Sequence, residues 1–279
     1  MANFDFDQAA GLRRMLAGPK PRIVTFLSAT PQDDKGAMLV NLGASLARAG
    51  NDVLLMDACA SAHGVATRLG LDGGASLLNV ARQECALNQV IHQVPQGFGV
   101  VSMAAPRGVR AGALQADEAR RLAKAFDVLV KQTGIVIVDG AFDGDSFPLP
   151  VMASSEIVVQ VSNSATSIKA AYCMIKRLNH EFGRRPFGIL VTGASETEAK
   201  VVYDNMAQAA SRYLAVNLTS MGSVPADEYL HRAARLGRAV VDAFPLAGAS
   251  VAFRELAGRF ARSAGPSLYS TGSSNHFSA

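Results

Sequence analysis

Short runs of consecutive apolar residues, each followed by a helical stretch, constrain the fold of this chain more than any other feature. Val53 to Met56 and Ile135 to Val138 are apolar at every position, and they end at Asp57 and Asp139. Continuous apolar strands are typical of parallel sheets that are covered on both faces. The repeated strand–helix order therefore predicts an α/β fold with a doubly wound, mostly parallel sheet and helices on both faces.

The pattern divides the chain into an arm, one α/β domain and a tail. We expect an N-terminal arm at residues 1–22, a domain at 23–264 and a disordered Ser/Gly-rich tail at 265–279. Strands are expected at 23–27, 53–56, 98–103, 135–138, 156–161, 187–191 and 218–224. Helices are expected at about 37–48, 117–133, 166–182, 196–213, 227–236 and 250–262, with two helical stretches within 65–92.

Cysteine and histidine positions give no sign of metal or disulfide chemistry. The three cysteines are far apart in the sequence and form no CxxC pair: Cys59, Cys85 and Cys173. The five histidines show no metal-ligand spacing: His63, His92, His180, His231 and His276. We therefore expect no metal site, and a reducing cytoplasm as the location.

Charge and hydropathy limit the remaining function classes. The N-terminus is polar, which predicts no signal peptide, and no uncharged apolar stretch reaches the ~20 residues that cross a bilayer. The net charge of +4 is compatible with an anionic partner or a membrane surface. Basic residues are scattered rather than clustered with aromatic ones, so no nucleic-acid partner is expected. No GxSxG motif indicates a nucleophilic hydrolase.

In a parallel sheet the site lies at the carboxyl ends of the strands. Here these ends are the loop after Leu27, Asp57 and Asp139. A nucleotide site would need main-chain N–H groups aimed at phosphates, a lysine, a Ser or Thr hydroxyl for magnesium, and strand-end carboxylates. The loop that should supply most of them reads Ser28-Ala29-Thr30-Pro31-Gln32-Asp33-Asp34-Lys35-Gly36.

The run VTFLSATPQDDKGAMLVNLGASLARAGNDVLLMDA, which begins at Val24, resembles the first strand, loop, helix and second strand of MinD/ParA ATPases. Those proteins carry a deviant Walker A loop, GKGGxGKT. The resemblance places the loop's final lysine on Lys35, the signature lysine on Thr30 and the magnesium-binding hydroxyl on Gly36. The loop glycines fall on Pro31, Gln32 and Asp34. Asp57 matches the first carboxylate of the family's DxD motif, with Cys59 in place of the second, and Asp139 matches the Walker B aspartate.

These replacements predict a poor phosphate cradle. Pro31 removes an N–H donor and fixes φ, where glycine would let the backbone approach phosphate closely. Asp33 and Asp34 add negative charge, which costs about 4 kcal/mol per charge pair at ~4 Å and an effective dielectric of ~20. We expect the binding of ATP and magnesium to be weak or absent. The alternative is that the loop rearranges and Lys35 still holds a phosphate. Asp57 and Asp139 could also simply end buried strands and cap the next turn.

Two further motifs resemble the flagellar-number proteins FlhG and FleN. SNSATSIKAAYCMIKRL, which begins at Ser162, is similar to that family's PEPTSITDAYALIK stretch. DQAAGLRRM, which begins at Asp7, resembles the DQAxxLR motif that docks on the GTPase FlhF in that family. The resemblance implies that Asp7, Gln8, Leu12 and Arg13 bind a partner. The alternative is a frayed N-terminal helix without a partner.

The C-terminal segment VAFRELAGRFARSA, which begins at Val251, has apolar residues near one side and several arginines. Relatives carry a membrane-targeting amphipathic helix in this general place, which implies membrane contact by Phe253, Leu256 and Phe260. The protein would then lie peripherally at the inner face of the cell membrane. The alternative is a terminal helix that packs on the core.

Three functions follow from these resemblances. The first is a regulator of flagellar number or placement that acts through FlhF and through flagellar basal-body or transcriptional regulator proteins. The second is an active MinD/ParA-type ATPase in which ATP switches dimerisation and membrane attachment. The third is a member of the same fold with a different ligand. The DQAAGLR motif favours the first two, and the loop from Thr30 to Gly36 favours the first over the second. The sequence leaves a homodimer open.

Overall fold

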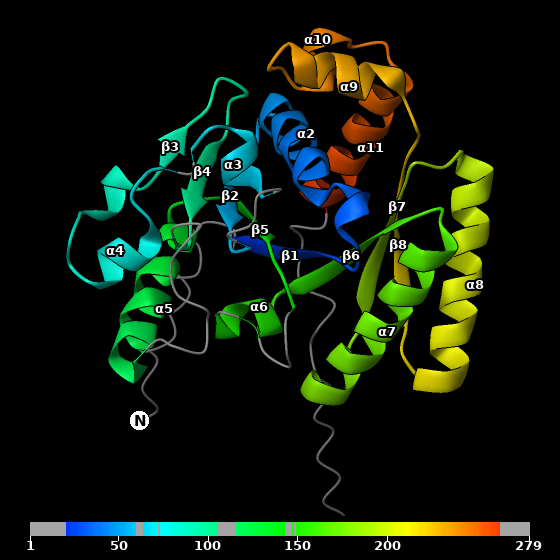
Figure 1. Cartoon of the computed structure of the whole chain (residues 1–279), viewed down its shortest axis with the longest axis horizontal. Coiled ribbons are helices and arrows are strands. Elements are labelled where there is room, and N and C mark those ends of the chain that lie inside the picture. Colours follow the sequence, from blue (N-terminus) through cyan, green and yellow to red (C-terminus); the bar gives the residue numbers. More distant parts are fainter. Residues whose placement is uncertain are drawn as a thin grey trace, which may run out of the picture.

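The computed structural model describes residues 21–59, 64–71, 73–104, 115–142, 147 and 149–262. Its centre is an eight-stranded sheet with the order β3-β4-β2-β5-β1-β6-β7-β8 (Figure 1). Neighbouring strands pair in parallel except β3 and β4. The strands are β1 (Arg22–Ser28), β2 (Val53–Asp57), β3 (His92–Gln93), β4 (Gly99–Ser102), β5 (Ile135–Asp139), β6 (Glu156–Ser162), β7 (Phe187–Thr192) and β8 (Leu218–Val224).

Helices cover both faces of this sheet, as the continuous apolar strands predict (Figure 1). One face packs against α2 (Lys35–Arg48), α3 (Val65–Arg68), α10 (Val240–Ala243) and α11 (Gly248–Arg262), with α9 (Glu228–Arg235) beside them. The other face packs against α7 (Ala165–Phe182) and α8 (Glu196–Leu214) on one half, and α4 (Leu77–Ala81), α5 (Ala116–Lys131) and α6 (Pro150–Ser154) on the other.

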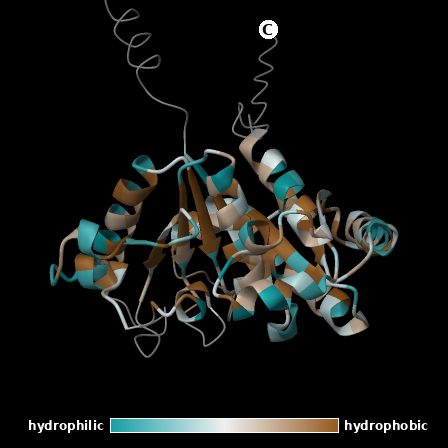
Figure 2. Cartoon of the chain, turned by 90° about the horizontal axis from the view of Figure 1, so that it is seen from above, coloured by the Kyte–Doolittle hydropathy of each residue, from teal (hydrophilic) through white to brown (hydrophobic). Residues whose placement is uncertain are grey.

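The period of two along each strand separates the core into layers. In β2, Val53 and Leu55 join the cluster under α2 and α11, whereas Leu54 and Met56 join the cluster under α4 to α6. Because both sets are buried, the strand carries no polar position until Asp57. Figure 2 shows this distribution, with apolar colour on the central strands and polar colour on the outward sides of the helices.

The expected elements are confirmed with small shifts at their ends. Four short elements were not predicted: the 3-10 helix η1 (Pro31–Asp33), β3, α6 and α10. Elements of two to five residues are too short to show a hydrophobic period. The helical region expected within 65–92 consists of α3, α4 and the 3-10 helix η2 (Leu87–Gln89), each of five residues or fewer.

The C-terminal helix α11 packs on the core. Phe253, Leu256 and Phe260, which the sequence suggested for membrane insertion, are at most 2% exposed. The ring of Phe260 lies 5.8 Å from that of Phe26 in β1, and Arg22 stacks over it. The structure thus corrects that interpretation in favour of its alternative, because these side chains complete the cover of the sheet.

Among the described helices, none combines the length and the apolar content that crossing a membrane requires. The partner-binding residues predicted in the arm, Asp7, Gln8, Leu12 and Arg13, lie outside the described residues, as does the predicted tail at 265–279.

Candidate functional site

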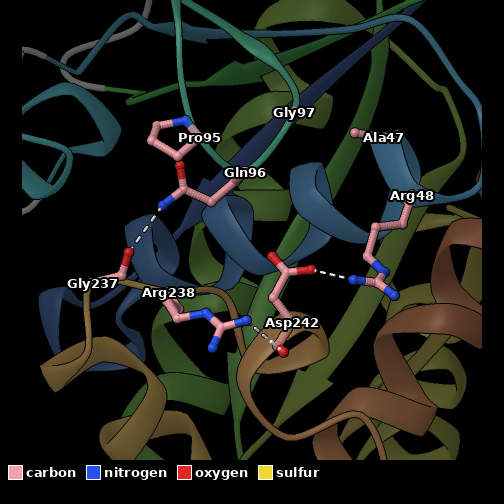
Figure 3. Close-up of a pocket in the computed structure, with 8 residues that line it drawn as sticks. All are labelled: Ala47, Arg48, Pro95, Gln96, Gly97, Gly237, Arg238 and Asp242. Carbon is pink, nitrogen blue, oxygen red and sulfur yellow. Dashed lines mark hydrogen bonds and ion pairs between the residues drawn. The ribbon is translucent and has the colours of Figure 1, made fainter.

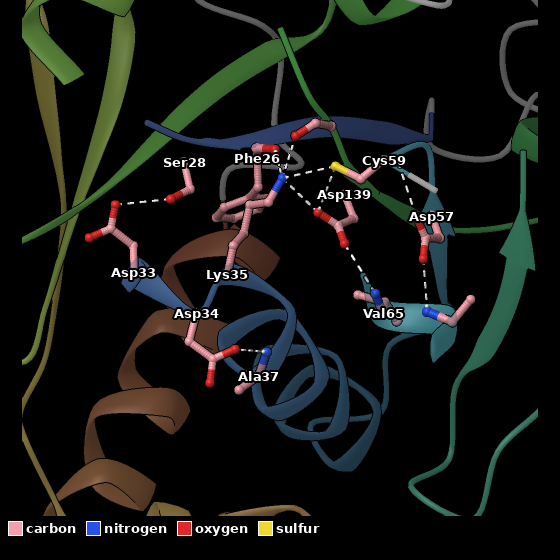
Figure 4. Close-up of polar contacts among 12 residues, drawn as sticks. Phe26, Ser28, Asp33, Asp34, Lys35, Ala37, Asp57, Cys59, Val65 and Asp139 are labelled. Atoms are coloured by element: carbon pink, nitrogen blue, oxygen red, sulfur yellow. Dashed lines mark hydrogen bonds and ion pairs between the residues drawn. The ribbon is translucent and has the colours of Figure 1, made fainter. Parts of the chain in front are cut away.

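The polar side chains at the carboxyl ends of β1, β2 and β5 form one cluster (Figure 4). The parallel register places Asp57 directly opposite Asp139, and it pairs Phe26 with Asp139 on the other side. The loop after β1 then carries Lys35 into α2, directly over this edge. The register therefore assembles three of the predicted site residues: Lys35, Asp57 and Asp139.

The loop between β1 and α2 adopts a 3-10 turn, η1, with Pro31 at its first position. Asp34 follows with φ 47° and ψ 52°, in the left-handed region, and it serves as the N-cap of α2. Its carboxylate accepts a hydrogen bond from the Ala37 N–H at 3.5 Å and forms an ion pair with Arg68 of α3. An aspartate thus lies at the N-terminus of the helix that carries Lys35.

Asp33 does not line the loop as the sequence suggested. Its side chain is buried, and its Oδ2 accepts hydrogen bonds from the hydroxyls of Thr30 at 2.7 Å, Ser28 at 3.0 Å and Ser167 at 3.1 Å. Of the two loop aspartates, Asp34 therefore has the half-exposed carboxylate at the α2 N-terminus, whereas the Asp33 carboxylate points into the protein. The three hydroxyl donors offset part of the cost of burying this carboxylate, while Oδ1 is buried without a hydrogen-bond partner among the described residues.

The Lys35 ammonium contacts four groups of the protein. Its nitrogen lies 2.6 Å from Oδ1 of Asp139 and 3.3 Å from Sγ of Cys59. It also donates to the main-chain oxygens of Phe26, at 3.3 Å, and of Gly140. The exposed fraction of the side chain is 11%, and that of Asp139 is 2%. This is a buried ion pair with additional hydrogen bonds, the arrangement that compensates the loss of hydration.

The pKa shifts follow from this burial and pairing. Burial lowers the pKa of Lys35, but the attraction of the Asp139 carboxylate outweighs it, so the pKa is raised above 10.5. Burial raises the pKa of the Cys59 thiol to about 12, although the nearby Lys35 ammonium opposes the shift. At neutral pH Lys35 is therefore an ammonium and Cys59 a neutral thiol.

The two strand-end carboxylates also bind main-chain N–H groups at the start of α3. Oδ2 of Asp57 accepts from Ala66 at 2.9 Å, and Oδ2 of Asp139 accepts from Val65 at 3.2 Å. The residue before the helix, Gly64, must be small because a Cβ there would lie 2.4 Å from Oδ2 of Asp57. Asp57 and Asp139 thus cap α3, the simpler role that the sequence left open for them.

Two other predicted positions have structural roles. Thr30 is the N-cap of η1 and donates its hydroxyl to Asp33, and Gly36 is the buried second residue of α2. Three residues that were not predicted contact the predicted ones from other parts of the fold: Gly64, Arg68 and Ser167. A glycine before a short helix and a serine near the start of a helix are weak signals in a sequence. The ion pair of Arg68 could not be predicted without knowing where α3 lies in the fold.

Two hollows lie away from this cluster. One of about 380 Å³ lies between the C-terminus of α2, the turn before β4 and the start of α10 (Figure 3). Its two arginines both contact Asp242, Arg48 through the carboxylate at 2.5 Å and Arg238 through the main-chain oxygen at 2.9 Å. The other, of about 650 Å³, lies between α8, β8 and α11. Neither is lined by Lys35, Asp57 or Asp139.

Solved structures identify the class of this fold. MinD of Pyrococcus horikoshii, solved with Mg-ADP, gives a TM-score of 0.65 at 16% identity, over 88% of this chain and 98% of that one. MinD of Aquifex aeolicus, in a complex with MinC, gives 0.64 at 17% identity, over 86% and 96%. With a lysine at the start of α2 and aspartates ending β2 and β5, the chain has the fold of a MinD/ParA-type P-loop ATPase.

Sequence similarity identifies the family within this class of proteins. The chain is 33% identical over 221 residues to the antiactivator FleN of Pseudomonas aeruginosa, and the alignment covers 78% of each protein. This chain belongs to the FlhG/FleN family of MinD/ParA-type proteins. No family model matches it.

Proposed function

We propose that this chain regulates flagellar number or placement, as the FlhG/FleN family does, and that it acts by binding protein partners rather than by hydrolysing ATP. The observation that carries the regulatory role is the similarity to FleN, which spans most of both chains and whose named activity is that of an antiactivator. A transcriptional activator is therefore one partner class. A FlhF-type GTPase is the other, because the arm carries DQAAGLR. Flagellar basal-body proteins are a third.

The site supports a degenerate nucleotide function. A Mg-nucleotide would need the Lys35 ammonium for a phosphate and free carboxylate oxygens for magnesium. Here the ammonium forms an ion pair with Asp139 and donates to two main-chain oxygens. Asp57 and Asp139 each accept an N–H of α3. Gly36 has no hydroxyl for magnesium, and Asp34 places an anion at the α2 N-terminus. These residues do not fit Mg-ATP as they are arranged here.

The partner-binding role of the arm is tested by co-purification. The full chain, immobilised, is expected to retain a FlhF-type GTPase, and Gln8→Ala with Arg13→Ala is expected to abolish retention. A double alanine variant at Thr219 and Ser220, exposed on the edge strand β8, serves as the control and should retain the partner. Equal retention by wild type and the arm variant, or none by either, would contradict the proposal.

A working ATPase is the second candidate, favoured by the survival of Lys35, Asp57 and Asp139 at one edge of the sheet. MinD of Pyrococcus horikoshii was solved with Mg-ADP. The molar mass in solution, measured by light scattering with and without Mg-ATP, separates the candidates. If the protein is a regulator that nucleotide does not switch, its molar mass is the same with and without Mg-ATP. A dimer that forms only with Mg-ATP would favour the ATPase.

A further inference from the structure

We propose that Asp34 is a built-in anion at the phosphate-binding end of α2, and that its ion pair with Arg68 latches α2 to α3 in place of a nucleotide. The inference rests on the proposed loss of nucleotide binding, because it assigns the group that takes the place of the phosphate. It concerns the state of the loop at rest, which the family resemblance does not specify.

The first support is the position of the Asp34 carboxylate. The first four N–H groups of a helix have no partner within the helix, and its dipole favours an anion there. In α2, a helix of 14 residues, the Asp34 carboxylate accepts from one of these groups, the N–H of Ala37. In a phosphate loop the same helix end receives the ligand's negative charge.

The second support is the backbone of Asp34. Its φ of 47° lies in the left-handed region, which residues with a Cβ rarely adopt and which glycine adopts without strain. Aspartate and asparagine tolerate this region better than other residues. The conformation brings the carboxylate back over the helix end, so a residue in a disfavoured conformation is the one that holds the charge.

The third support is the way in which Arg68 is held in reach. Arg68 is the last residue of α3, and the first turn of α3 is fixed by Asp57 and Asp139. Its guanidinium pairs with Asp34 although the two side chains remain 31% and 48% exposed. Three carboxylates therefore hold the four-residue helix α3 against α2: those of Asp34, Asp57 and Asp139. Held in this way, α3 closes this edge of the sheet.

The test compares the full chain with Asp34→Asn in thermal unfolding, in inorganic phosphate or in chloride at equal ionic strength. Asparagine still caps a helix and tolerates the left-handed region, so the variant keeps its fold while Arg68 and the helix end lose their anion. At phosphate about tenfold above its dissociation constant, Tm of the variant should rise by about 3 °C. The Tm of the wild type should rise only by the smaller, general stabilisation that phosphate gives a folded protein, and the figure for the variant is the rise beyond it.

Two further variants decide the outcome. Asp127→Asn, on the exposed face of α5, removes the same charge elsewhere, and a phosphate response equal to that of Asp34→Asn would overturn the latch. Arg68→Gln should speed amide exchange in residues 64–71 about two- to fivefold, the loss of one partly exposed ion pair. Unchanged exchange would also overturn it. Titration of the wild type with Mg-ATP tests the proposed function separately, because binding there would contradict it without affecting the phosphate comparison.

Discussion

At the scale of single residues, Lys35 and Asp139 form a buried ion pair, and we propose that its role is structural. Both are buried, and their atoms lie 2.6 Å apart within a set of main-chain acceptors and donors. In such a pair the loss of hydration is offset only while both charges are present. A substitution at Lys35 therefore acts on the stability of the fold, whereas in an ATPase its main effect would be on nucleotide binding.

Lys35→Met should lower the free energy of unfolding by about 3–5 kcal/mol, because the Asp139 carboxylate would remain buried without its cation. Urea denaturation of the nucleotide-free protein measures this directly. Adding Asp139→Asn should recover most of the loss, since the amide is neutral and can still accept from Val65. A loss below about 1 kcal/mol in the single variant, or no recovery in the double, would show that the pair is not structural.

The Cys59 thiol should make stability fall with pH above 9. An ordinary thiol with a pKa of 9.0 loses its proton in the unfolded chain, whereas the folded protein keeps it until about 12. Folding is therefore opposed increasingly as pH rises through this window, by about 1 kcal/mol between pH 9 and 10. The contribution of Lys35, whose pKa is raised, is lost only above 10.5 and in the same direction.

Urea denaturation at pH 8, 9 and 10 checks this pH dependence. Cys59→Ala should have a shallower decline than the wild type, and Cys173→Ala, at an exposed cysteine on α7, should match the wild type. If the wild type and Cys59→Ala lose the same free energy between pH 9 and 10, the buried-thiol account is wrong.

At the scale of elements, α3 is the segment whose position defines the site. It is only four residues long, too short to be stable by itself. Its position is set by N–H groups that donate to Asp57 and Asp139 and by the fit of Gly64 against Asp57. The closed edge of the sheet therefore depends on a contact that tolerates no side chain at residue 64.

Gly64→Ala should destabilise the protein by about 1–3 kcal/mol and loosen α3, because the new Cβ would overlap the Asp57 carboxylate. Chemical denaturation gives the free energy, and amide exchange at Val65 and Ala66 reports the cap. Gly73→Ala is the matched control, since a Cβ there meets nothing within 4 Å. Equal stability of the two variants would count against the role assigned to Gly64.

At this scale, part of the site could be predicted from the sequence and part could not. Apolar runs that end at Asp57 and Asp139 follow from local pattern, so the sheet and the meeting of these two residues were predictable. The place of Lys35 in the site was predicted from the resemblance to MinD/ParA ATPases. The turn of Asp33 into the protein was not, because it depends on Ser167, 134 residues away. The pairing of Arg68 with Asp34 likewise depends on where α3 docks.

At the scale of the whole molecule, α11 completes the cover of one face of the sheet. Its aromatic residue Phe260 packs on Phe26 of β1, and Arg22 at the start of β1 stacks over the same ring. Arg22 also donates to the Phe260 main-chain oxygen. Arg22 and Phe260, which lie near the two ends of the described domain, are thus in direct contact.

Phe260→Ala should lower the free energy of unfolding by about 3–5 kcal/mol, because a fully buried aromatic ring leaves a cavity between α11 and the sheet. Val251→Ala, on the same helix at a residue that is 42% exposed, should lose less than about 1 kcal/mol. Denaturation with urea measures both. A loss at Phe260 no larger than that at Val251 would mean that α11 is not part of the core.

We propose that this chain keeps the MinD/ParA-type fold while its own side chains make the contacts that a phosphate would need. Isothermal titration of the full chain with Mg-ATP tests it most directly. We predict no saturable heat, which corresponds to a dissociation constant weaker than about 1 mM. Micromolar binding that is lost in Lys35→Met would contradict the claim, since the ammonium would then serve a phosphate rather than Asp139.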